Sequence, residues 1–146
     1  MYNTILVPLD GSERAETILN HVENLAERYQ AKVILMEVLE LPHTVVASDG
    51  IYVPDPQIIE ERRRYAQGYL ASIQERFRAN GIDTAYQVSS GRVIDAIIET
   101  AEREKVDLVA MASHGRTGLA RVFYGSVAAG VLHRIDRPLL LVRAKD

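Results

Sequence analysis

Residues 4–12 read TILVPLDGS, and this stretch decides the predicted fold. Its first six residues form a short, continuous apolar run, which is typical of a strand buried on both faces of a parallel sheet. Asp10-Gly11-Ser12 then ends the run, and Ser12 is a good N-cap for a following helix. Apolar residues at helical spacing continue beyond it, so we expect an amphipathic helix over residues 13–29.

The same alternation of apolar runs and helical patterns continues to the end of the chain. It predicts an α/β fold, with a parallel sheet, helices on both faces and right-handed crossovers. The third strand alternates in polarity, which places it nearer an edge. The predicted strands cover residues 4–9, 32–39, 83–88, 107–112 and 138–142, and the predicted helices 13–29, 57–80, 92–104 and 127–134.

Three segments between or within these elements carry more specific signals. Residues 41–56 hold three of the five prolines and an Asp-Gly turn signal at 49–50, so we predict a loop there. Gly81 follows the long helix and is expected to end it as a C′ glycine. The three arginines at 62–64 fit either an anion patch or a solvated face paired with the acids at 60–61, and the second interpretation is favoured.

Length and composition limit the functions to be considered. The chain has 146 residues and a net charge of −3, so one domain over residues 1–146 is expected. It has no cysteine, which rules out a disulfide framework, a thiolate metal site and cysteine catalysis. A pI near 5.8 argues against a nucleic-acid binder with a broad basic surface. With neither a bilayer-spanning stretch nor a basic leader, we expect no membrane association and a cytoplasmic location.

Two predicted loops carry the chemistry of a ligand site. In open parallel sheets, ligands bind beyond the carboxyl ends of the strands, where the strand order reverses. The loop at 8–12 follows the first strand, and Asp10 offers a carboxylate for a ribose hydroxyl or a phosphate-bound metal. The loop at 112–118 follows the fourth strand, and Arg116 adds positive charge to it. The Gly-Ser pair at 125–126 begins a helix, where free N–H groups favour phosphate.

Motifs of several other classes are missing from the sequence. It contains no G-x-x-x-x-G-K-[ST] of a P-loop, no G-x-G-x-x-G of a dinucleotide site and no G-x-S-x-G nucleophile elbow. The four histidines form no metal-ligand pair, and His114 alone lies in a candidate loop. Structural explanations stay open for the candidates: the glycines shape a long turn, Asp10 ends its strand and Ser12 only caps a helix.

Four stretches carry a resemblance to a known family. They are ILVPLDGSERAE at 5–16, KVILMEVLE at 32–40, VDLVAMASHGRTGLARVFYGSV at 106–127 and RPLLLVR at 137–143. Together they resemble the universal stress protein family over essentially the whole chain. Members of that family that bind ATP carry G-x-x-G, nine residues, then G-[ST]. Gly115, the nine residues after it and the pair at 125–126 fit this pattern, whereas Ala112 replaces the first glycine.

The resemblance implies a single-domain, doubly wound sheet of five parallel strands in the order 3-2-1-4-5. It also implies a site for ATP, with Mg²⁺, between the first and fourth strands. Asp10 would lie near the ribose or phosphates, Val38 would meet adenine through its backbone, and Met111 would flank the base. The residues expected to bind nucleotide are Pro8, Leu9, Asp10, Val38, Met111, Ala112, Gly115, Arg116, Gly125, Ser126 and Val127.

Three functions fit this resemblance to different degrees. The first is an ATP-binding regulator or sensor in the stress response, with at most slow hydrolysis because no general base has a clear partner. The second is a dimeric interaction module that binds no nucleotide, which Ala112 favours. The third, an adenylating enzyme, needs a glycine-serine-rich phosphate loop that residues 9–13 lack. Family members are usually dimers, and an apolar last strand would be an exposed edge, so we expect a homodimer through residues 137–143.

Overall fold

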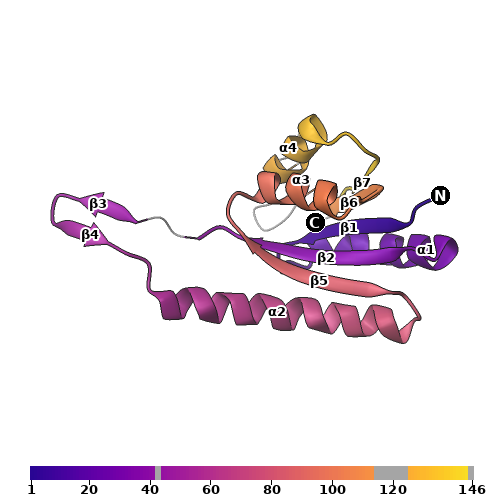
Figure 1. Ribbon diagram of the computed structural model, residues 1–146, viewed down its shortest axis with the longest axis horizontal. Helices are drawn as coiled ribbons and strands as arrows, with labels where there is room; N and C mark the ends of the chain where they lie inside the picture. The colour runs from indigo at the N-terminus through magenta and orange to yellow at the C-terminus, as the bar shows by residue number, and fades with distance from the viewer. Residues whose placement is uncertain (42–43, 114–124, 145–146) are drawn as a thin grey trace.

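The computed structural model describes residues 1–41, 44–113 and 125–144 (Figure 1). Its main sheet has five strands in the order β5-β2-β1-β6-β7, and every neighbouring pair is parallel. This order confirms the 3-2-1-4-5 arrangement expected from the resemblance. The strands are β1 (Thr4–Leu9), β2 (Lys32–Leu39), β5 (Thr84–Ser90), β6 (Leu108–Ala112) and β7 (Leu139–Val142).

Helices cover both faces of the sheet, as the predicted alternation requires. α1 and α2 pack on one face, and α3 and α4 pack on the other (Figure 1). Within the described ranges, no helix combines the length and apolar character needed to cross a bilayer. The helices are α1 (Leu19–Tyr29), preceded by the 3₁₀ turn η1 (Ala15–Ile18), α2 (Pro56–Ala79), α3 (Val93–Arg103) and α4 (Ser126–Arg134).

Alternate residues of the central strands build two separate cores. Ile5 and Val7 of β1 point to the face covered by α1 and α2, and Leu6 between them points to α3 and α4. Phe77 of α2 is fully buried in the first core and Ile97 of α3 in the second. Because both faces of β1 are covered, its sequence is a continuous apolar run rather than an alternating one.

The segment 41–56 differs from the sequence prediction. The sequence predicts a loop, but the structure contains an antiparallel hairpin of β3 (Val45–Ala47) and β4 (Gly50–Tyr52), which projects from the body of the protein (Figure 1). β-branched and aromatic residues on either side of a two-residue turn favour such a hairpin. The loop prediction was wrong because it weighed the prolines of the segment above these short strand-forming runs.

The first helix begins later than the sequence predicts. A single helix is predicted over 13–29, whereas the chain forms the turn η1 first and the α-helix α1 only afterwards. Ser12 does act as a cap, since the Ala15 N–H donates to its Oγ at 3.2 Å. Ser12 also donates to Asp10 through both its N–H and its hydroxyl. This compact turn uses the residues that would otherwise form the first helical turn.

The remaining element boundaries agree with the prediction to within two residues. Gly81 follows α2 with φ +77°, the left-handed conformation of a C′ glycine, as predicted. β5 and β7 are the two edges of the sheet, which confirms the edge positions expected for the third and last strands.

α3 and α4 approach each other closely at Gly130. A Cβ atom at this position would lie 2.1 Å from Cδ1 of Ile94, so the bare glycine backbone permits the contact. Arg134 near the end of α4 also hydrogen-bonds Asp95 of α3, and this bond lowers the pKa of the Asp95 carboxyl. Together these contacts fix the position of α4 against α3.

Alanine at Gly130 should therefore behave differently from alanine at Gly68. Both glycines lie inside helices, where replacement by alanine gains about 1 kcal/mol of helix propensity. An added Cβ at Gly68 meets nothing within 4 Å, so Gly68→Ala should raise the free energy of unfolding by that amount. The free energy of unfolding of Gly130→Ala should be lower than this gain predicts, by about 1–3 kcal/mol, because the Ile94 side chain must move. Urea unfolding measures both, and equal gains would contradict the close contact.

Candidate functional site

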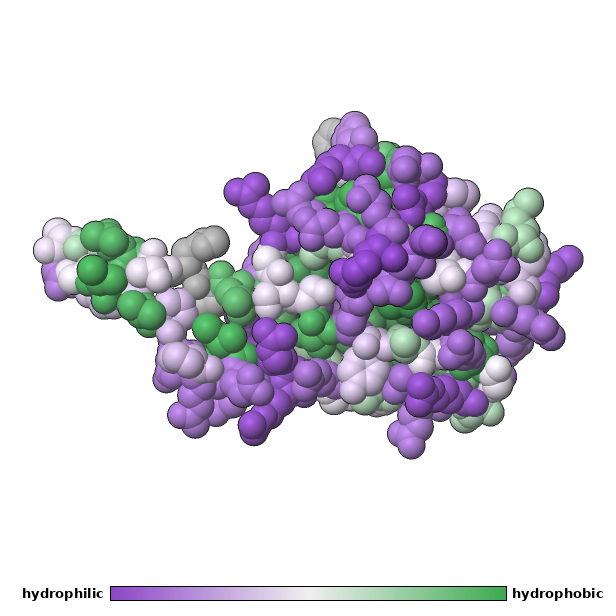
Figure 2. Space-filling view, in the orientation of Figure 1, coloured by the Kyte–Doolittle hydropathy of each residue, from purple (hydrophilic) through white to green (hydrophobic). Residues whose placement is uncertain are grey.

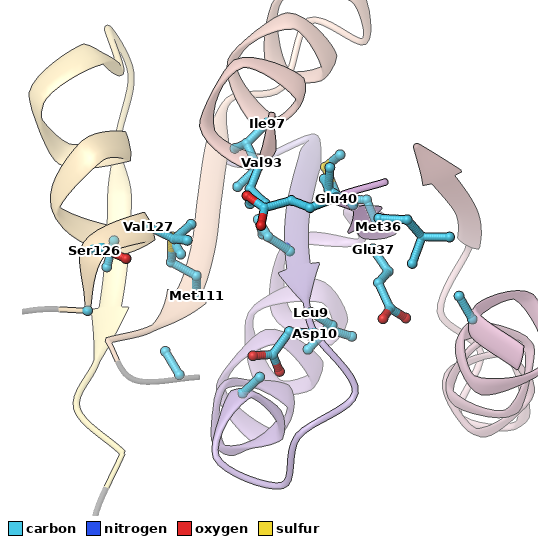
Figure 3. A pocket seen from close by; sticks show the side chains of 18 of the residues that line it. Leu9, Asp10, Met36, Glu37, Glu40, Val93, Ile97, Met111, Ser126 and Val127 are labelled. Carbon is cyan, nitrogen blue, oxygen red and sulfur yellow. The ribbon is translucent and has the colours of Figure 1, made fainter. Parts of the chain in front are cut away.

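A cleft of about 690 Å³ opens at the carboxyl ends of β1, β2 and β6 (Figure 3). β1 pairs with β6 at only two positions, Ile5 with Leu108 and Leu6 with Val109. Beyond Leu6 the two strands separate, so their carboxyl ends stand apart at the point where the strand order reverses. The volume lies in the range of about 300–1,000 Å³ that is usual for small-molecule sites.

The cleft brings together most of the residues that the sequence predicts for nucleotide binding. They come from four separate parts of the chain: the end of β1, the end of β2, the end of β6 and the start of α4. Gly115 and Arg116, like His114, lie outside the described residues. The predicted residues that line the cleft are Pro8, Leu9, Asp10, Val38, Met111, Ala112, Gly125, Ser126 and Val127.

The start of α4 faces the cleft with backbone donors. The Ala129 N–H donates to the Gly125 carbonyl at 2.9 Å, which is the first hydrogen bond of the helix. The Gly125 N–H donates to the Ser113 carbonyl at 2.5 Å. The N–H groups of 126–128 belong to the first turn, where no intrahelical acceptor exists. Such a helix end attracts anions, phosphate above all. Figure 3 shows Ser126 and Val127 on this side of the cleft.

Ser113 connects this helix end to the edge of the sheet. Its N–H donates to the Val142 carbonyl of β7 at 2.9 Å, while its own carbonyl accepts from Gly125. Ser113 is only 3% exposed, and its hydroxyl has no hydrogen-bond partner among the described residues. Its backbone therefore fixes the wall of the cleft.

Asp10 has a structural role as well as a place in the cleft. Its Oδ1 accepts from Ser12 N at 3.0 Å and from Ser12 Oγ at 2.5 Å. Gly11 between them has φ +82°, which lets the chain turn sharply beside the cleft. The structural explanation of Asp10 is thus confirmed, and its carboxylate also lines the cleft.

Sequence analysis missed a second wall of the cleft, which is acidic and aromatic. Glu37 lines it from β2, and Arg62 and Tyr65 line it from α2. Glu40, the residue after β2, also lines the cleft, but its side chain extends toward Val93 of α3 (Figure 3). The two glutamates could have been predicted from the sequence, because both stand at the carboxyl end of the strand that is expected beside the first one. The α2 residues could not, because their position depends on the path through the hairpin.

The three arginines at 62–64 have different partners. Arg64 forms an ion pair with Glu60 at 3.4 Å, which confirms part of the predicted pairing. Arg63 donates to the Ser90 hydroxyl at 3.1 Å. Arg62 donates to the Glu40 carbonyl at 3.4 Å and lines the cleft, so it is not simply part of a solvated face.

Tyr69 of α2 lies close to the acidic side of the site. Burial raises the pKa of Tyr69 well above its ordinary value, and the carboxylates of Glu16, Glu37 and Asp10 raise it further by repelling a phenolate. Its hydroxyl is buried and has no hydrogen-bond partner in the part of the chain that the structure describes. No group of three His, Asp or Glu side chains suited to a metal ion occurs in that part.

Tyr69→Phe should make the protein less sensitive to alkali. Above the ordinary tyrosine pKa of 10.0, the unfolded chain releases the phenol proton while the folded protein keeps it. The free energy of unfolding therefore falls with rising pH, and phenylalanine removes this contribution. Denaturant unfolding between about pH 9 and pH 11 should show a growing advantage of the variant. The control, Tyr65→Phe on the exposed surface, should show none, and parallel curves for both variants would refute the assignment.

The fold and the cleft define an α/β protein with a ligand site where the strand order of a parallel sheet reverses. The family model of the universal stress protein family matches residues 1–143. The chain therefore belongs to the universal stress protein family.

Individual relatives agree with this assignment. The universal stress protein MJ0577 of Methanocaldococcus jannaschii is 27% identical over 158 aligned residues, covering 100% of this chain and 98% of that protein. Its solved structure superposes with a TM-score of 0.87 and 29% identity, covering 100% of this chain and 99% of that chain.

Two more distant structures share the fold and contain nucleotides. A universal stress protein solved in complex with cAMP gives a TM-score of 0.68 at 24% identity and covers 99% of this chain and 98% of that chain. The universal stress protein of Archaeoglobus fulgidus in complex with dAMP gives 0.65 at 21% identity and covers 96% and 97%.

Proposed function

We propose that this chain binds an adenine nucleotide, specifically ATP with Mg²⁺, and acts as a regulator or sensor in the stress response. The observation that carries the proposal is the gathering of nine predicted site residues around one cleft. Relatives of the same fold solved with cAMP and dAMP support the ligand class. Residues 1–146 would act as one nucleotide-binding domain in the cytoplasm.

The two sides of the cleft suit the two ends of a nucleotide. Met111 and Val127 supply apolar surface, and Val38 brings the backbone of β2 to the cleft for polar contact with a base. The first turn of α4, with Ser126, offers N–H groups and a hydroxyl to phosphates. A base between the strand ends and phosphates at the helix start would fill the cleft in this orientation.

Mg²⁺ fits the charges of the cleft. Protein sites usually hold this ion through one or two carboxylates together with substrate phosphates. Asp10 stands at the end of β1 in the cleft, so it would hold the ion against the phosphates bound at α4. The ion would also reduce repulsion between the phosphates and the acidic lining of Glu37 and Glu40. We assign this site binding roles and expect slow hydrolysis at most.

An alternative function rests on Ala112. The family pattern has glycine at this position, and the alanine here is buried in the wall of the cleft. The resemblance to ATP-binding family members implies that the glycine lies against the ribose, so the added methyl group would take up space there. If that space is essential, the chain is a dimeric interaction module that does not bind nucleotide.

Calorimetric titration of the nucleotide-free protein separates these functions. With Mg²⁺ present, we expect micromolar ATP binding that weakens through ADP to AMP, because each lost phosphate removes contacts at α4. Gly125→Val should reduce ATP affinity at least tenfold, about 1.4 kcal/mol, by filling the space beside the first turn. Ala112→Gly should increase the affinity.

The control for these variants is Gly68→Ala, which lies on α2 away from the cleft lining and should leave ATP affinity unchanged. Unchanged ATP affinity in a folded Gly125→Val protein would refute the site. Failure of the wild-type protein to bind ATP, ADP and AMP would favour the interaction module, and recovery in Ala112→Gly would identify the methyl group as the cause.

We also propose a homodimer through residues 137–143. β7 is an edge of the sheet with β6 as its neighbour in the described structure, and its four apolar residues are only half-buried. Such an edge favours pairing with a second strand. Light scattering should give a mass above the 16.3 kDa of one chain, rising with concentration. A constant monomer mass would contradict the dimer.

A further inference from the structure

Exposed apolar residues are concentrated in one short part of the chain. Seven of the ten large apolar residues exposed in the described structure lie between positions 45 and 65. We call this surface the apolar overhang. Figure 2 shows apolar side chains gathered on the projecting hairpin, and Ile58 and Tyr65 lie on α2 beyond it. Apolar residues exposed together in this way are typical of an interaction surface. The apolar overhang consists of Val45, Val46, Ile51, Tyr52, Val53, Ile58 and Tyr65.

The hairpin in this overhang is apolar on both faces. Val45 pairs with Tyr52, and Val46 pairs with Ile51. Neighbouring residues of a strand point to opposite faces, so each face carries one apolar pair. Val46 is 77% exposed and Ile51 is 67% exposed. A hairpin that covered its own protein would keep one polar face toward water, whereas here neither apolar face is covered by the described part of the same chain.

The hairpin is also too small to be stable without support. Its two strands have three residues each, and in the described structure they pair only with each other. An isolated two-stranded hairpin is marginal in water. One internal contact supports the tip, where the Tyr52 hydroxyl donates to Asp49 at 2.7 Å. A partner that packs on its faces would supply the missing stabilisation.

The charges around the overhang are complementary to each other across two copies. The hairpin carries Asp49 at its tip and no basic residue between positions 44 and 55. The first half of α2 carries Arg62, Arg63 and Arg64 against Glu60 and Glu61, which leaves it a net positive charge, although Arg64 also pairs with Glu60. Within one copy, the tip projects away from α2 (Figure 1), so this acid and these arginines do not meet. In a two-fold arrangement, the tip of each copy would reach α2 of the other. A two-fold interface requires such self-complementary surfaces.

We infer that two copies of this chain exchange their β3–β4 hairpins, each hairpin packing on the first half of α2 of the other copy. The apolar faces of the hairpin would cover Ile58 and Tyr65, which line the open side of the cleft. Asp49 of each copy would meet Arg62 and Arg64 of the other. The second copy therefore closes the cleft from outside. This contact is separate from the β7 edge and does not depend on nucleotide binding.

Sedimentation velocity without nucleotide tests the exchange. Val46→Lys combined with Ile51→Lys places charge on a hairpin face that the exchange would bury, and it should halve the mass of the assembly. The matched control is Leu132→Lys, an apolar residue of α4 that is 48% exposed outside the overhang, and it should leave the mass unchanged. The mass of the lysine variant then tests the β7 contact. If the variant is a monomer, β7 does not pair between copies, and if it is a dimer, β7 does.

A mixing experiment identifies the second copy as the partner. Asp49→Lys alone, and Arg62→Glu with Arg64→Glu alone, should each dissociate because like charges meet at both contacts. When the two variants are mixed, every contact again joins opposite charges, so the larger assembly should return. Reversing both sets within one chain should restore it as well.

Several results would overturn the exchange. The first is a wild-type protein whose mass is no larger than that of the Val46→Lys, Ile51→Lys variant. The second is a mixture of the two charge variants that stays dissociated. Binding of the wild-type protein to phosphatidylglycerol vesicles, lost in the lysine variant while the mass is equal, would assign the overhang to a membrane surface instead. Far-UV circular dichroism confirms that each variant is folded, which these exposed substitutions permit.

Discussion

The separation of β1 from β6 is the constraint on which the rest of the site depends. The two strands pair at their first positions and then diverge, while β1 stays paired with β2 along its whole length. The chain leaves β1 toward β2 and later returns on the other side to form β6, so within residues 1–41, 44–113 and 125–144 no connection crosses the gap between the carboxyl ends of β1 and β6. Asp10 and Met111 consequently line the same cleft, although they are far apart in sequence.

Much of this arrangement could be predicted from the sequence, and the reasons are local. Continuous apolar runs identify buried strands, and Asp10-Gly11-Ser12 marks the turn because each residue type suits its backbone position. The strand order came from the family resemblance rather than from periodicity. The hairpin was missed because the prolines of its segment were weighed above two strand-forming runs of only three residues each. The wall formed by α2 was missed because its position depends on the path of the chain through that hairpin.

The cleft has an uneven distribution of charge that divides its chemistry. The α4 end offers backbone donors and suits an anion, whereas the β2 side brings the Glu37 carboxylate. Among the described residues, the α4 end would therefore attract the anionic part of a ligand and the Glu37 side would repel it. Arg62, which lines the same side as Glu37, moderates this asymmetry.

Ser113 gives the architecture a form of robustness against sequence change. Its peptide N–H and carbonyl join β7 to the start of α4, and neither bond uses a side chain. Any residue other than proline that tolerates a buried position could make the same two bonds. The spacing between the outer strand and the helix start therefore depends on the path of the chain rather than on particular side chains. Substitutions around the cleft could alter which molecule it accepts and leave this spacing unchanged.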